Sequence, residues 1–170
     1  MKDDYHESFT ADDIQNFPSV VDRFYEKFRY SYQTEENHLV LAHSNGIVLV
    51  QLCPEHPVFQ SGIAEISYDV GQVDRSNNEV KGKSKRGGLV LQERTQLAVI
   101  RSKDGKEYKI VSPLAGKLVE VNKSLAENPD LVRKEGDGYV AIILPKQDVL
   151  KKEKVKWEQI GGPIVRIENV

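Results

Sequence analysis

The sequence predicts a mainly β protein, built as one antiparallel barrel or sandwich with small helices at its edges. Two observations favour this fold class. Asn45-Gly46 and Asp104-Gly105 each separate two short apolar runs, a pattern typical of tight hairpins because both turn residues tolerate positive φ. In addition, many strand-sized apolar segments follow one another closely, with turn residues between them.

The remaining elements follow in order along the chain. Ser19 is expected to cap a helix from about residue 20 to 29, in which Val21, Phe24 and Phe28 form an apolar stripe. Strands are expected at 38–43, 47–52, 64–70, 79–83, 96–101, 107–111, 117–122 and 139–144. A short covering helix is expected at 122–128, and a lysine-rich helix from 145 to about 159.

Charge and composition divide the chain into three regions. Of its 170 residues, 39% are hydrophobic, which is enough for one domain with a core. Residues 1–17 hold five acids against one lysine and are expected to form a disordered acidic head. A barrel domain is expected at 18–146, followed by a basic C-terminal helix and tail at 147–170.

Composition also excludes several classes of protein. The apolar runs are far shorter than a bilayer span, and the acidic N-terminal residues are unlike a signal peptide. A lone cysteine, Cys53, cannot form an internal disulfide, which favours a reducing compartment. The net charge of −2 excludes a uniformly basic nucleic-acid binder but leaves a local basic patch open. We therefore expect an intracellular protein with no membrane partner.

The strongest candidate for a binding site is a basic stripe formed by Lys81, Lys83, Lys85 and Arg86. Alternate spacing would place its three lysines on one face of an extended strand. Such a ridge suits an acidic protein surface, a phosphate backbone or a nuclear import receptor. The alternative is an edge strand that lysines protect against aggregation.

Two further features bear on chemistry. Cys53 and His56 suggest a metal ligand or a nucleophile, but a zinc site would need a second pair of ligands, and a buried cysteine beside a turn histidine is the favoured interpretation. The sequence contains no nucleotide-binding or hydrolase motif, so no catalytic residue, metal or cofactor is expected. Trp157 either docks on the domain or anchors a partner, and the sequence leaves both open.

Part of the C-terminal half resembles a known carrier domain. Segments 112–122, 125–132 and 138–140 are similar to biotinyl and lipoyl carriers, and above all to the glycine-cleavage H-protein. This resemblance implies a barrel-sandwich hybrid fold. It also implies that the modified lysine stands at a hairpin tip, seven residues before Ser112, where this chain has Gly105 between Lys103 and Lys106. A neighbouring lysine is a poor substitute, because a shift of one residue turns a side chain to the other face of a strand.

A wider resemblance covers about residues 19–146. It rests on Val21-Asp22-Arg23-Phe24-Tyr25, His43-Ser44-Asn45, His56-Pro57-Val58-Phe59-Gln60-Ser61-Gly62, Ile66-Ser67-Tyr68, Val80-Lys81-Gly82-Lys83-Ser84-Lys85-Arg86-Gly87 and 138–146. These motifs resemble the Abitram (Simiate) family of actin-binding transcription modulators. The resemblance implies actin as a partner and effects on filament dynamics in cell projections such as lamellipodia and growth cones. It also implies a nuclear pool in speckles beside the cytoplasmic one.

Two alternative functions stay open. The first is a lipoyl or biotin carrier domain that serves an enzyme complex. The second is a nucleic-acid-binding module that would combine the basic stripe with Tyr68 or Tyr108 as stacking surfaces.

Overall fold

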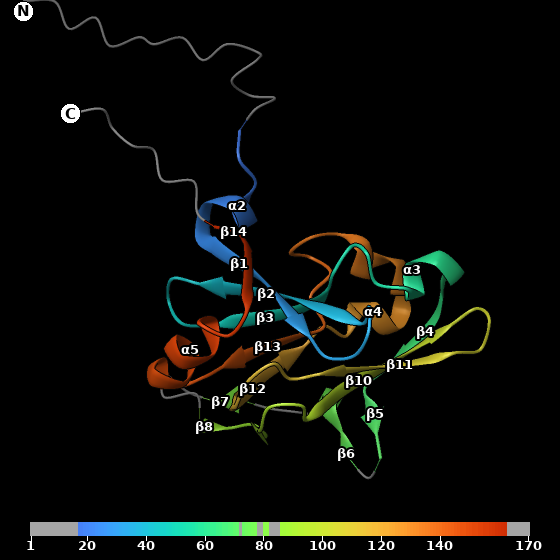
Figure 1. The fold of residues 1–170 in the computed structure, drawn as a ribbon. Coiled ribbons are helices and arrows are strands. Elements are labelled where there is room, and N and C mark those ends of the chain that lie inside the picture. The colour runs from blue at the N-terminus through green and yellow to red at the C-terminus, as the bar shows by residue number, and fades with distance from the viewer. Residues whose placement is uncertain (1–16, 72, 78–79, 82–85, 163–170) are drawn as a thin grey trace, which may run out of the picture.

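The computed structural model describes residues 17–71, 73–77, 80–81 and 86–162 (Figure 1). Its strands are β1 Tyr25–Ser31, β2 Asn37–His43, β3 Val48–Leu52, β4 Ile63–Ser67, β5 Asp69–Val70, β6 Val73–Asp74, β7 Val80–Lys81, β8 Arg86–Gly87, β9 Val90–Leu91, β10 Gln96–Ser102, β11 Glu107–Val111, β12 Gly116–Val121, β13 Ala141–Leu144 and β14 Glu158–Gly161. Its helices are α2 Val20–Phe24, α3 Val58–Ser61, α4 Ser124–Glu127 and α5 Gln147–Lys154, with 3-10 turns η1 Arg75–Asn77 and η2 Pro129–Arg133.

Two antiparallel sheets enclose a shared core. The larger sheet has the strand order β14-β1-β2-β3-β13-β12-β9, and the smaller has the order β11-β10-β4. The pairs β5–β6 and β7–β8 form short ribbons outside these sheets. The chain is therefore a barrel-sandwich hybrid, and the expected mainly β fold class is confirmed.

Both hairpins that the sequence predicted are present. Strand β2 pairs with β3 around Asn45-Gly46, and β10 pairs with β11 around Asp104-Gly105. Gly46 and Gly105 have φ of +95° and +89°, the left-handed region in which a glycine costs least. The side chain of Asn45 also accepts a hydrogen bond of 3.1 Å from the Ile47 N–H, which stabilises the first turn.

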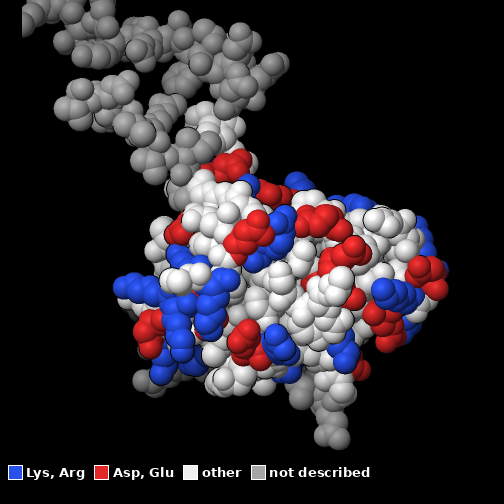
Figure 2. All heavy atoms as spheres, in the orientation of Figure 1, with Lys and Arg blue, Asp and Glu red and all other residues white. Residues whose placement is uncertain are grey.

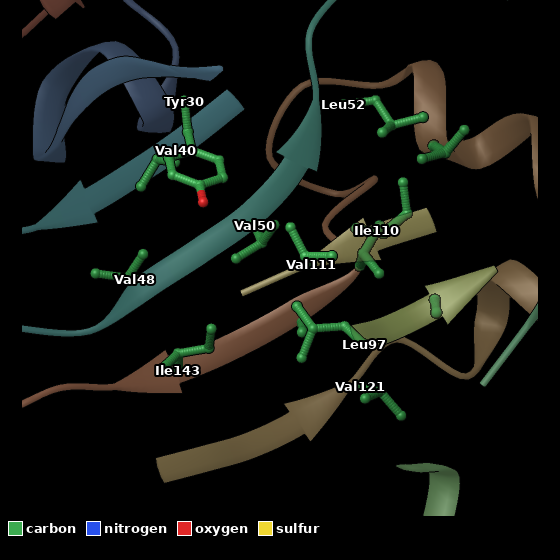
Figure 3. Packing of buried hydrophobic residues seen from close by; sticks show 14 of the residues in the cluster. Tyr30, Val40, Val48, Val50, Leu52, Leu97, Ile110, Val111, Val121 and Ile143 are labelled. Carbon is green, nitrogen blue, oxygen red and sulfur yellow. The ribbon is translucent and has the colours of Figure 1, made fainter. Parts of the chain in front are cut away.

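The core lies between the two sheets (Figure 3). Val40, Val50 and Ile143 project from the larger sheet toward Leu97 and Ile110 of the smaller one (Figure 3), and all five side chains are fully buried. Burial of each such side chain contributes about 1.5–3 kcal/mol. This cluster is the main source of hydrophobic stabilisation in the domain.

A second apolar cluster covers the outer face of the larger sheet. The cluster contains Leu39, Leu41 and Leu49 of the sheet, and Val21 of α2 packs with them. Because alternate residues of a strand point to opposite faces, β2 is buried on both sides, with Val40 in the main core and its neighbours in the outer cluster. Helix α2 thus acts as a cover for the sheet.

The N-terminal helix is shorter than the sequence suggested. Ser19 caps it as expected, with its Oγ 3.1 Å from the Asp22 N–H. The helix ends at Phe24, however, and the expected extension to residue 29 is wrong, because 25–31 pair with β2 as strand β1. Phe28 and Tyr30 are buried on the core side of that strand. A spacing of four residues fits a strand as well as a helix, and pairing with β2 decides between them.

The C-terminal helix also ends early. Helix α5 stops at Lys154, and the expected continuation to about residue 159 is wrong, because β14 turns back to pair with β1. Trp157, between the two, is 8% exposed and meets the ring of Phe28 edge-on at 5.7 Å. The segment therefore docks on the domain, which the sequence left open.

Smaller differences concern boundaries. The strand expected at 64–70 is divided into β4 and β5, and the last strand begins at Ala141 rather than at residue 139. The covering helix lies at 124–127, within the expected range. The acidic head lies outside the described residues except for Phe17.

No helix in the described part of the chain combines the length and apolar character needed to cross a membrane.

Candidate functional site

The position that corresponds to a carrier lysine lies at the tip of the β10–β11 hairpin. Gly105 occupies it, and a Cβ added there would meet no atom within 4 Å. Hydrogen bonds to Asp104 stabilise the turn, because this carboxylate accepts from the Ser61 hydroxyl (2.9 Å) and the Lys106 N–H (3.1 Å). The hydroxyl of Ser102 also bonds Asp104, and the pKa of that carboxyl is lowered mainly by this bond. The tip is an ordered turn around a residue with no side chain, and it is tied to the end of α3 through Ser61.

The two lysines beside the tip have structural contacts of their own. The ammonium of Lys106 lies 4.6 Å from the centre of the Tyr108 ring, a cation–π arrangement. The stem of Lys103 lies beside Gly62, where an added Cβ would come within 3.2 Å of its Cδ. Neither lysine takes the place of Gly105 at the turn.

Cys53 and His56 are buried beneath the α3 turn. Burial raises the pKa of the Cys53 thiol to about 12 and lowers the pKa of His56 to about 4. The thiol therefore stays protonated and the imidazole neutral, so the pair lacks an activated nucleophile. Among the described residues, no group of three or more His, Cys, Asp or Glu side chains could hold a metal ion.

The two tyrosines considered as stacking surfaces for nucleic acid are buried. Tyr68 is 5% exposed, and its hydroxyl donates to the carbonyls of Asn122 (2.8 Å) and Val140 (3.0 Å). Tyr108 is 3% exposed and packs edge-on against His56. Neither ring offers a free face to a base, so this part of the nucleic-acid hypothesis is wrong.

The basic stripe does not form a single strand. Lys81 in β7 pairs with Arg86 in β8 in an antiparallel register, so the chain reverses between them. Lys83 and Lys85 lie outside the described residues. The expected alignment of Lys81, Lys83 and Lys85 along one extended strand therefore falls largely outside the described residues, of which Lys81 and Arg86 lie opposite each other in a two-stranded ribbon.

A groove that the sequence did not reveal lies where β9, the start of β12 and the start of α5 meet. We call it the α5 groove. Its volume is about 460 Å³, within the range of ligand-binding pockets. It is lined by Val90, Leu91, Gln92, Ala115, Gly116, Lys117, Leu144, Pro145, Lys146 and Val149. Apart from one glutamine and two lysines, the lining is apolar.

The floor of the α5 groove depends on a glycine. A Cβ added to Gly116 would lie 2.8 Å from Cγ2 of Ile143 and 3.0 Å from Cα of Pro145, so β12 can pass this close to the end of β13 only without a side chain. Leu150, on the inner side of α5, is 7% exposed and joins the core. Val149, one residue earlier, is half-buried against the same core and also lines the groove.

Lysines surround the α5 groove. Lys117 and Lys146 belong to its lining, and Lys151 and Lys152 are exposed on α5. Figure 2 shows lysine and arginine atoms gathered over this helix. Lys154 and Lys156 lie farther along the chain, where Lys154 bonds Glu26 at 2.8 Å and Lys156 bonds Glu153 at 2.9 Å. The result is an apolar depression with a positive rim.

Strand β9, which lines the groove, follows closely after the basic stripe in the sequence. Arg86 and Gly87 of β8 stand only a few residues before Val90, and β9 pairs with β12 at Lys117. Strand β8 and helix α5 therefore each connect within a few residues to a segment that lines the groove. The sequence could not show this, because the groove joins residues near 90, 116 and 145 through tertiary packing alone.

Comparison with known proteins identifies the family. Protein Abitram of Drosophila melanogaster is 45% identical to this chain over 150 residues, an alignment that covers 85% of this chain and 70% of the fly protein. The chain belongs to the Abitram family.

Other relatives in the Abitram family support the same assignment. The human protein is 38% identical over 138 residues and the Dictyostelium discoideum protein 35% over 135 residues, each alignment covering about three quarters of both chains. No family model matches the chain. Among solved structures, a glycine cleavage system H protein from Mycobacterium marinum has a TM-score of 0.48 and 14% identity, and the match covers 71% of this chain and 84% of that one.

Proposed function

We propose that this member of the Abitram family is a non-catalytic binding protein whose partner is actin, and that it influences filament dynamics in cell projections. The proposal also includes a nuclear pool in speckles with a role in transcription, reached through the import machinery. Membership of the Abitram family, which relatives across most of the chain show, supports this proposal. Actin binding and the role in transcription are what the resemblance to that family implies.

One structural observation indicates which surface of the domain would bind actin. The exposed Lys151 and Lys152 of α5, together with Lys117 and Lys146 of the lining, give this side of the domain a positive rim around an apolar groove. An acidic protein surface is attracted to such a rim, and the attraction acts mainly on the association rate. The buried and neutral Cys53 and His56 offer no competing catalytic centre.

The experiment is cosedimentation and monomer binding with purified actin. Changing Lys146, Lys151 and Lys152 to Glu should weaken binding by about ten-fold or more at low salt, and the effect should shrink as ionic strength rises. Lys103, Lys109 and Lys123, exposed elsewhere on the domain, provide a matched charge-reversal control. A separate variant with Lys81, Lys83, Lys85 and Arg86 changed to Ser tests the stripe.

The outcomes test the binding surface, the actin proposal and the carrier alternative separately. Actin binding that the α5 lysines and the stripe both leave unchanged would remove this side of the domain from the mechanism. Failure of actin to bind under any condition would end the actin proposal. Intact-mass measurement of protein from its native cells tests the carrier alternative, because a lipoyl or biotinyl group would have to appear on Lys103 or Lys106, next to Gly105.

A further inference from the structure

We propose that the α5 groove binds an acidic, amphipathic helical segment of a partner protein. Apolar side chains of the segment would enter the groove, and its carboxylates would meet the lysine rim. Identification of the partner as actin rests on the proposed function, but the chemistry of the occupant rests on the groove alone.

The walls of the groove expose apolar surface that a monomeric protein normally covers. Val90, on β9, is 72% exposed, and Val149 of α5, which is half-buried against the core, lines the same groove. Leu91 and Pro145, beneath them, are already buried. A partner side chain placed between the two valines would remove apolar area from water on both sides at once, which is the geometry of an interface anchor.

Charge selects an acidic occupant. Val149 and Lys152 are three residues apart on α5, so they share one face of the helix. Lys146 lies at the start of the same helix, and Lys117 lies across the groove on β12. No acidic side chain is among the residues that line the groove. An apolar segment flanked by carboxylates would pair with these lysines, whereas a basic segment would be repelled.

The shape of the groove favours a helical segment. Strand β9 spans only two residues, which is too short for an added strand to gain its affinity from backbone hydrogen bonds. Helix α5 forms one wall, and ridges of a second helix could pack along it through residues at i, i+3, i+4 and i+7. No aromatic ring is among the lining residues, so the groove lacks the stacking surface that binds single-stranded nucleic acid. A concave wall is also unlike the continuous apolar face of a membrane-binding helix.

The test uses a fluorescent synthetic peptide of about five helical turns, with leucines on one face and glutamates elsewhere. A peptide of the same composition with its leucines dispersed around the helix serves as one control, and a version with lysines in place of the glutamates serves as another. Fluorescence anisotropy measures affinity, and amide shifts of Val90, Leu91 and Gly116 locate the peptide. Anionic vesicles form a separate arm.

Matched variants separate apolar contact from charge. Val90→Ser should weaken peptide binding by about ten-fold, the amount expected for a lost valine contact. Val155→Ser is the control, because Val155 is even more exposed, at 86%, and does not line the groove; its affinity should stay within about two-fold of wild type. Lys146→Glu together with Lys152→Glu should also weaken binding, in contrast to Lys109→Glu on β11.

Several results would overturn the proposal: failure of the amphipathic peptide to bind, equal affinity for the dispersed peptide, or equal affinity of the Val90→Ser variant. Binding to anionic vesicles but not to the peptide would replace it with a membrane contact. Displacement of the peptide by monomeric actin would join the groove to the proposed function. If the peptide binds but actin does not displace it, the groove stands and actin is excluded from this site.

Discussion

Two buried histidines support the core as neutral rings. His38 accepts a hydrogen bond of 3.0 Å from the Val111 N–H through Nε2, and its Nδ1–H donates to the Glu36 carbonyl. His56 accepts from the Val58 N–H through Nδ1, which leaves its buried Nε2 without a hydrogen-bond partner among the described residues. Each ring therefore joins segments distant in sequence or tightens a turn. Among the described residues neither ring is hydrogen-bonded to a carboxylate, and the charge of Glu55, which favours protonated His56, is outweighed by burial and by the charge of Lys106.

Because both histidines are buried as neutral rings, the free energy of unfolding should decrease in mild acid. Burial lowers the pKa of His38 to about 3 and of His56 to about 4, against 6.5 as the ordinary value. At a pH between the lowered pKa of each folded histidine and the ordinary value of 6.5, the unfolded chain binds more protons than the folded one. The contribution to stability is therefore complete above pH 6.5 and declines as the pH falls toward 4. At pH 5 the expected loss is about 1–2 kcal/mol for each histidine.

Urea unfolding between pH 7 and pH 5 measures this effect, in a window where most carboxylates remain ionised. The variant His56→Gln should be less stable at pH 7 but should show about half the pH dependence, because one of the two titrating rings is gone. Equal pH slopes for the variant and the wild type would show that His56 does not titrate in this way.

At the scale of elements, local signals and long-range packing differ in what a sequence reveals. Both hairpins were predictable because Asn-Gly and Asp-Gly determine the turn through their own backbone preferences. Strand β1 was not, since Phe24 and Phe28 fit two periodicities and only pairing with β2 selects one. The α5 groove was also hidden, because Gly116 gives no sign in the sequence that it lies against Ile143. The basic stripe was visible as composition, but its reversal between β7 and β8 was not.

The segment that joins α5 to β14 is expected to be essential for stability. Trp157 packs on Phe28 and is nearly fully buried, so Trp157→Ala should cost about 3–5 kcal/mol of unfolding free energy. Ile160, which is 42% exposed on β14, supplies the control, and Ile160→Ala should change stability by less than about 1 kcal/mol. Chemical denaturation measures both. A Trp157→Ala variant as stable as the wild type would mean that this contact contributes nothing to the fold.

At the scale of the whole molecule, the apolar core of the described residues reaches almost to the C-terminal end of the described chain. Every residue of the two apolar clusters lies between Val21 and Trp157. The folded unit that we infer therefore extends beyond the boundary expected at residue 146 and includes α5 and β14.

Removal of residues 1–16 is accordingly expected to leave the thermal midpoint almost unchanged. The reason lies in the sequence, because this segment is rich in acidic residues and poor in the branched apolar residues that build a core. Differential scanning calorimetry of the full chain and of the shortened one makes the comparison. A decrease of several degrees would indicate a contribution of about 1 kcal/mol or more from the head, and the prediction would be wrong.

The pairing of β14 with β1 has a consequence for how the chain emerges from the ribosome. Strand β1 is synthesised long before β14, which pairs with it in the finished sheet. One edge of β1 therefore stays unpaired, and the Phe28 ring stays uncovered, until Trp157 and β14 have left the ribosome. Such open edges invite pairing with other chains. Lys27 and Arg29, which alternate with the apolar residues of β1 and later pair with acids, place charge along that edge. The same residues that form ion pairs in the finished domain would thus protect the nascent chain from aggregation.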